Sequence, residues 1–125
     1  MGLISIQSKD PETLSQFRVD QIVVLAGDGK LKDGSVASDE FRTFLRAVPL
    51  SALRKFTQET LEKSFPDSGF VLQDLVNELG RRVGYSVENG RYRGVVNQVG
   101  HDGLWESDSM RLVVEVKTTE SLPIF

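Results

Sequence analysis

The apolar residues of this chain change their spacing at Pro66, and this change constrains the fold more than any other feature. Before Pro66 they recur every three or four residues, which is typical of amphipathic helices. After it come one further helical pattern and three short apolar runs separated by turn residues, which is typical of strands joined as hairpins. The 125 residues include no cysteine, so a disulfide framework and a thiolate metal site are excluded. We therefore expect an α/β (α+β) protein in which a helical region, 1–65, precedes a mixed region, 66–125.

The helical region is expected to hold three helices. The first begins at Asp10-Pro11, a capping residue followed by a proline in the first helical position, and continues to Gly27. The second covers 38–48, and the third, capped by its first residue, covers 51–65. No set of catalytic side chains stands out among these helices. We interpret the region as a packing, dimerisation or docking module.

The mixed region is expected to contain one helix and three strands. Its helical pattern ends at Gly84, and the Ser-Asp-Ser sequence at 107–109 predicts a tight turn between the last two strands. The expected bounds are 69–84 for the helix and about 85–92, 100–106 and 111–118 for the strands.

The last of these strands carries two charges within an apolar segment. Four of the six residues 112–117 are Leu or Val, which predicts a strand buried on both faces in the middle of a sheet. Glu115 and Lys117 are two residues apart and share one face of that strand. Asp102 lies one hairpin earlier, where an antiparallel neighbour would bring it beside Glu115. The alternative is an ion pair on an exposed edge strand.

These side chains have the chemistry of a metal centre. Buried charges are unfavourable unless they are paired or bind an ion. Two carboxylates and a backbone carbonyl provide the oxygen ligands that hard cations prefer. We expect Asp102 and Glu115 to hold Mg²⁺ or Mn²⁺, and Lys117 to hold the attacking water or to neutralise charge on a phosphate.

Asp102 followed by Glu115-Val116-Lys117 resembles the motif of the PD-(D/E)XK nucleases, the restriction-endonuclease-like superfamily. The segments 72–79 and 84–88 are similar to the opening helix and first strand of its Mrr-type branch. In that family the helix often presents an acid or a glutamine to the metal site, and Gln73 stands at the matching position. The resemblance implies a metal-dependent nuclease that hydrolyses phosphodiesters of nucleic acid, with DNA favoured and RNA left open, and with Asp102, Glu115, Lys117 and Gln73 as its catalytic residues.

The resemblance covers about 69–119 and has two departures. His101 stands where the family name expects proline. The family core is similar to helix, three strands, helix and strand, whereas the sequence ends at Phe125. We therefore expect a shortened relative or a piece of a longer bacterial protein whose further domains supply specificity, with a homodimer through the helical region as a further possibility.

The charge balance bears on the partners. Fifteen basic and 18 acidic residues give a net charge of −3, and the absence of a polybasic tail argues against a protein that coats DNA. Candidate nucleic-acid contacts are Arg93, Asn97, Gln98 and Thr118, with a solvated hairpin surface as the alternative. The sequence shows no membrane span and no signal peptide, so a cytoplasmic protein is expected. The competing hypothesis is a nuclease-like fold without catalysis that serves dimerisation or protein docking.

Overall fold

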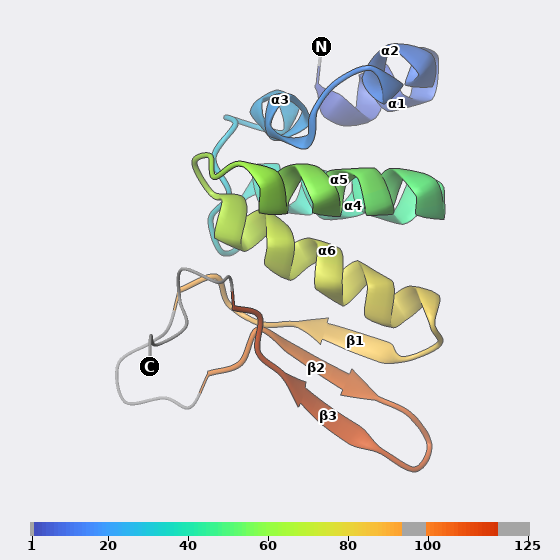
Figure 1. The fold of residues 1–125 in the computed structure, drawn as a ribbon, viewed down its shortest axis with the longest axis vertical. Coiled ribbons are helices and arrows are strands. Elements are labelled where there is room, and N and C mark those ends of the chain that lie inside the picture. Colours follow the sequence, from blue (N-terminus) through green and yellow to red (C-terminus); the bar gives the residue numbers. More distant parts are fainter. Residues whose placement is uncertain (1, 94–99, 118–125) are drawn as a thin grey trace. The chain divides into compact units, whose positions relative to one another are not determined.

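The computed structural model describes residues 2–93 and 100–117. Over these residues it contains six helices followed by a three-stranded antiparallel sheet (Figure 1), the α+β fold with helices before the sheet that the sequence predicts. The chain divides into two compact units, 1–68 and 69–125, which we call the helical unit and the sheet unit. Within the described residues, no helix combines the length and the apolar character needed to cross a lipid bilayer.

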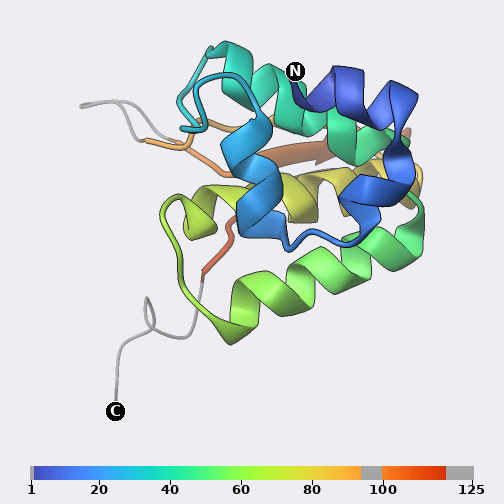
Figure 2. The same cartoon turned by 90° about the horizontal axis from the view of Figure 1, so that it is seen from above.

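The helical unit holds the first five helices. Helix α1 packs against α2 and α4, and Figure 2 shows α1 lying beside α4. The rings of Phe44 and Phe56, on α4 and α5, have centroids 5.9 Å apart, and both side chains are buried. The bounds are α1 (Leu3–Lys9), α2 (Pro11–Ser15), α3 (Val19–Leu25), α4 (Val36–Ala47) and α5 (Leu50–Glu62).

The expectation of one helix from Asp10 to Gly27 is wrong, because this stretch holds two helices, α2 and α3, and α1 precedes them. Pro11 has no N–H to continue α1, and Asp10 leaves the helical conformation to cap α2. Its carboxylate accepts the Thr13 N–H at 3.4 Å. A second break precedes α3, whose first backbone N–H groups must find partners outside the helix.

Helices α4 and α5 begin earlier than the sequence analysis expects. Ser35 caps α4, because its hydroxyl oxygen accepts the Ser38 N–H at 3.1 Å. Val48 adopts an extended conformation before Pro49 and ends the helix. Pro49 then occupies the capping position of α5, so the expected cap at Ser51 is wrong.

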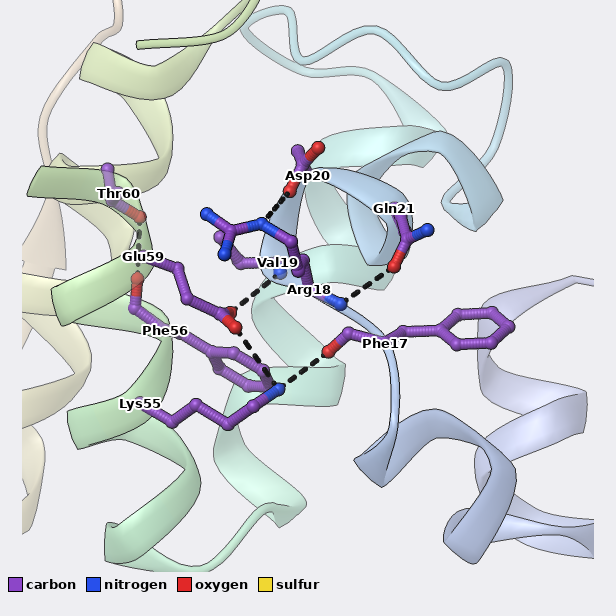
Figure 3. Close-up of polar contacts among 9 residues, drawn as sticks. All are labelled: Phe17, Arg18, Val19, Asp20, Gln21, Lys55, Phe56, Glu59 and Thr60. Atoms are coloured by element: carbon purple, nitrogen blue, oxygen red, sulfur yellow. Dashed lines mark hydrogen bonds and ion pairs between the residues drawn. The ribbon is translucent and has the colours of Figure 1, made fainter. Parts of the chain in front are cut away.

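A buried carboxylate links α5 to the start of α3 (Figure 3). Glu59 is 8% exposed, and its Oε1 accepts the Val19 N–H at 3.0 Å. Lys55, one turn earlier, lies 3.3 Å from Glu59 Oε2 and also donates to the Phe17 carbonyl at 2.7 Å. Glu59 therefore satisfies the Val19 N–H at the N-terminus of α3, and Gln21 accepts the preceding Arg18 N–H at 2.9 Å.

The sheet unit consists of α6 and the sheet. The strands pair antiparallel in the order β1-β2-β3, with Val87 opposite Trp105 and Leu104 opposite Val113. Each strand is shorter than its expected range. The bounds are α6 (Ser68–Arg82), β1 (Ser86–Asn89), β2 (Gly103–Glu106) and β3 (Arg111–Val114).

The expectation that 112–117 forms a strand buried on both faces is wrong for the described sheet. Strand β2 has a neighbour on each side, whereas β3 lies at an edge of this sheet and ends at Val114. Val113 is 65% exposed. An apolar run on a strand therefore does not by itself require a central position, because one face of an antiparallel sheet can remain in water.

Candidate functional site

The pairing of β2 with β3 determines where Asp102 and Glu115 lie. Gly103 and Val114 are the last paired residues at this end of the ladder, and Asp102 and Glu115 are the next residues on each side. The Asp102 N–H donates to the Val114 carbonyl at 3.0 Å. Asp102 Oδ2 accepts the Val116 N–H at 2.6 Å. The Asp102 carboxylate therefore lies against the backbone of the residue between Glu115 and Lys117.

Glu115 and Lys117 form an ion pair at this end of the hairpin. Glu115 Oε2 and Lys117 Nζ are 3.8 Å apart, so the spacing of two does bring the charges together. Their side chains are 57% and 55% exposed, and the burial expected for them is wrong. Both residues follow β3 at the edge of the described sheet, where water reaches them. Such a pair contributes about 1 kcal/mol or less to stability.

Gln73 lies on the buried face of α6 and contacts backbone atoms of the sheet unit. Its Nε2 donates to the Gly90, Arg91 and Asp102 carbonyls at 3.3, 3.3 and 3.2 Å. Gln73 thus contacts the main chain of Asp102, and its own amide is engaged in these hydrogen bonds. Gln73 is therefore connected to the candidate site by its hydrogen bond to the Asp102 carbonyl.

Asn77, one turn further along α6, is a buried polar residue that the sequence motifs do not include. Asn77 is fully buried, and its Nδ2 donates to the Asp102 carbonyl at 2.8 Å while its Oδ1 accepts from Trp105 Nε1 at 3.0 Å. A signal for it was present, because Gln73 and Asn77 are four residues apart and share one face of α6. Buried amides must find partners, so this spacing indicates a shared polar target.

The other buried polar groups of α6 are occupied by neighbours within the sheet unit. Asp74 Oδ2 accepts a short hydrogen bond from the Tyr92 hydroxyl. Glu78 pairs with Arg82 at 2.7 Å and with Arg81 at 3.6 Å.

The remaining candidates have mixed outcomes. Arg93 is exposed, and its guanidinium carbon lies 5.6 Å from the centroid of the Phe70 ring. Asn97, Gln98 and Thr118 lie outside the described residues. His101 is half-buried, and its Nδ1 has no hydrogen-bond partner among the described residues.

Asp102 and Glu115 are the candidate ligands for a hard divalent cation at this end of the hairpin. The part of the chain that the structure describes holds no cluster of three His, Cys, Asp or Glu side chains placed around a metal position. Mg²⁺, however, keeps several waters and is commonly bound through one or two carboxylates. Asp102 Oδ1 accepts no hydrogen bond from the described residues, and the Glu115 carboxylate is accessible. Asp102 and Glu115 are the residues that can hold the cation.

The helical unit has a separate feature, an apolar cavity of about 700 Å³. Residues from α1, α2, α4 and α5 line it, among them Leu14, Phe44 and Phe56. Lys55 also lines the cavity, but its ammonium group is paired with Glu59 and donates to the Phe17 carbonyl. The cavity thus offers apolar contacts and no uncompensated charge.

The resemblance to the PD-(D/E)XK nucleases rests on Asp102, on Glu115-Val116-Lys117 and on the preceding helix. No family model, curated protein or solved structure matches this chain.

Proposed function

We propose that this chain is a metal-dependent nuclease module that hydrolyses phosphodiesters of DNA with Mg²⁺ or Mn²⁺. The observation that carries the proposal is the hydrogen bond from the Val116 N–H to Asp102 Oδ2. It brings one carboxylate to the stretch of backbone that bears a second carboxylate and an ammonium group. A pair of acids that can hold a cation, beside a lysine that can stabilise charge on a phosphate, suits metal-assisted hydrolysis of a phosphodiester.

The residues take distinct parts in this proposal. Asp102 and Glu115 hold the cation, which supplies positive charge for the phosphate when bound. Lys117 holds the water that attacks phosphorus or stabilises the charge that grows on the phosphate oxygens as the P–O bond breaks. Gln73 supports Asp102 from α6.

The order of elements supports the same proposal. Helix α6 followed by β1, β2 and β3 agrees with the opening part of the restriction-endonuclease-like core that the resemblance implies. The acid at the start of β2 and the Glu-Val-Lys sequence after β3 agree with the positions of the family motif. We further propose that specificity comes from other domains of a longer protein, and that the helical unit serves in docking or in a homodimer.

The proposal is tested by incubating the full chain with linear, circular and single-stranded DNA in Mn²⁺. We expect the wild type to cleave DNA. Lys117→Ala should cleave it at least about 100-fold more slowly, because one charged group at the reacting phosphate is removed. Lys32→Ala, a change of an exposed loop lysine in the helical unit, is the matched control and should cleave like the wild type. Equal inactivity of all three proteins contradicts the proposal.

One observation favours a second candidate function, a nuclease-like module without catalysis that docks a protein or a second copy. The ion pair of Glu115 and Lys117 is more than half exposed and sits beyond the end of an edge strand, as an ordinary surface pair does. This candidate expects no cleavage by any of the three proteins and no effect of Mn²⁺ on stability.

A further inference from the structure

We infer that Asn77, together with Gln73, is a positioning residue that fixes Asp102 in the orientation its metal-binding role requires. The two amides hold the main-chain carbonyl of Asp102, and neither needs to touch a cation or a substrate. This inference rests on the proposed function for its metal-binding part. Its structural part, the control of where the Asp102 carboxylate points, is measurable without metal.

Asp102 is held at three places. Its carbonyl oxygen accepts from Asn77 Nδ2 at 2.8 Å, from the Gly90 N–H at 2.9 Å and from Gln73 Nε2 at 3.2 Å. A carbonyl has two lone pairs, so three donors saturate this oxygen. Its N–H is bonded to Val114 and its carboxylate to the Val116 N–H. The backbone of Asp102 therefore has little freedom, and its side chain is directed toward Val116.

The orientation of the Asn77 amide is set by Trp105. An indole N–H only donates, so it selects the oxygen of the amide, and Asn77 Oδ1 lies 3.0 Å from Trp105 Nε1. The amide nitrogen is then left to face the Asp102 carbonyl. An aspartate at position 77 could still accept from the indole but would set a carboxylate oxygen against a carbonyl oxygen.

Two glycines make the close approach possible. A Cβ at Gly103 would collide with Asn77 Oδ1, and a Cβ at Gly90 would collide with the carbonyl of His101. The backbone at both positions is therefore free of side chains where α6 reaches Asp102. Two glycines, two amides and an indole thus surround the main-chain carbonyl of Asp102. We infer that this arrangement serves to place the carboxylate of the same residue.

The test compares Asn77→Asp with Asn89→Asp in the full chain. The two variants make the same chemical change within the sheet unit. Asn89 Oδ1 accepts from Arg81 Nη2 at 3.1 Å, and an aspartate there keeps that bond. Trp105→Phe is a second variant, which frees the Asn77 amide to turn and is used where Asn77→Asp does not fold.

The first readout is hydrogen exchange of the Val116 amide, measured by NMR without metal. We expect exchange at least about tenfold faster in Asn77→Asp and unchanged in Asn89→Asp, because a displaced Asp102 carboxylate no longer protects this amide. The Ser107 N–H, bonded to the Met110 carbonyl at 2.8 Å in the turn between β2 and β3, is the internal reference. A merely structural role for Asn77 would accelerate both amides.

The second readout is Mn²⁺ affinity by calorimetry, at a temperature where each variant is folded. We expect the affinity of Asn77→Asp to fall about 10- to 100-fold, as is typical when a group that orients a ligand is removed. Unchanged Val116 exchange in Asn77→Asp, or equal acceleration at Val116 and Ser107, overturns the inference. Absence of Mn²⁺ binding in the wild type, with selective exposure of Val116 in the variant, overturns the proposed function and supports the positioning of Asp102.

Discussion

Glu59 and Glu115 are both acids in the sequence, but their surroundings give them opposite roles. Glu59 is 8% exposed and has both a backbone donor and an ammonium group as partners. Glu115 is 57% exposed and pairs only loosely with Lys117. A buried carboxylate with partners is destabilising to remove, whereas an exposed one can be exchanged at little cost in stability and is available to bind.

The first prediction concerns the stability of the helical unit. Glu59→Ala leaves the buried Val19 N–H without an acceptor and should lower the free energy of unfolding by about 1–3 kcal/mol. Glu59→Gln keeps an oxygen for that N–H and loses the charge opposite Lys55, so it should lower it by about 1 kcal/mol or less. Urea unfolding followed by circular dichroism measures both. Glu62→Ala, an exposed change on the same helix, is the control, and an equal effect at both positions contradicts the prediction.

Much of the candidate site could be predicted at this scale, because it depends on spacing along strands. The spacing of two in Glu115 and Lys117 and the position of Asp102 one hairpin earlier were sufficient to bring them to one end of the β2–β3 ladder. Exposure of Glu115 was not predictable, since it depends on how many strands flank β3. Asn77 was missed because its spacing from Gln73 indicates only a shared face of α6, and the backbone carbonyl that both amides bond cannot be identified from the sequence.

Elements were predicted best where periodicity continues and worst at their ends. The helical pattern of 69–84 corresponds to α6, Ser68–Arg82, with ends that differ by one and two residues. Of the expected strand 85–92, only the four residues Ser86–Asn89 form β1. The next residue, Gly90, still donates its N–H to the Asp102 carbonyl at 2.9 Å. Pro11 separates α1 from α2. The helical spacing of apolar residues continues from α2 into α3, so the sequence does not reveal the break between these two helices.

The second prediction concerns the packing of α6 on β2. A Cβ at Gly80 would lie 2.6 Å from the Trp105 ring, so Gly80→Ala should cost about 1–3 kcal/mol by overpacking, which exceeds the roughly 1 kcal/mol that alanine adds to a helix. Gly69→Ala, in the first turn of the same helix, meets no atom within 4 Å and should raise stability by about 0.5–1 kcal/mol. Trp105, the single tryptophan, reports both by fluorescence during urea unfolding. Effects of the same sign would show that α6 and β2 do not approach this closely.

At the scale of the whole molecule, the two parts of the sequence differ in net charge. Residues 1–65 carry nine basic and nine acidic side chains, whereas 66–125 carry six and nine, so the net charge of −3 belongs to the second part. Asp102 and Glu115 contribute two of its negative charges. A divalent cation between them would remove most of the repulsion that this part presents to a phosphodiester. Under the proposed nuclease function, binding of DNA is therefore expected to depend on the cation rather than on a basic surface.

The third prediction follows from this dependence and is measured by thermal unfolding of the full chain. A ligand that binds only the folded state at about 100 times its Kd stabilises it by about 2.7 kcal/mol, which for a chain of this size is a rise in Tm of roughly 5–15 °C. We expect Mn²⁺ to raise the Tm of the wild type in this way and to leave that of Glu115→Ala unchanged. Glu106→Ala removes an acid of similar exposure, which pairs with Arg111, and is the matched control. A rise in Tm that persists in Glu115→Ala would place the cation elsewhere. A Tm of the wild type that Mn²⁺ does not change would favour the docking function, because a cation bound at these acids must stabilise the fold that brings them together.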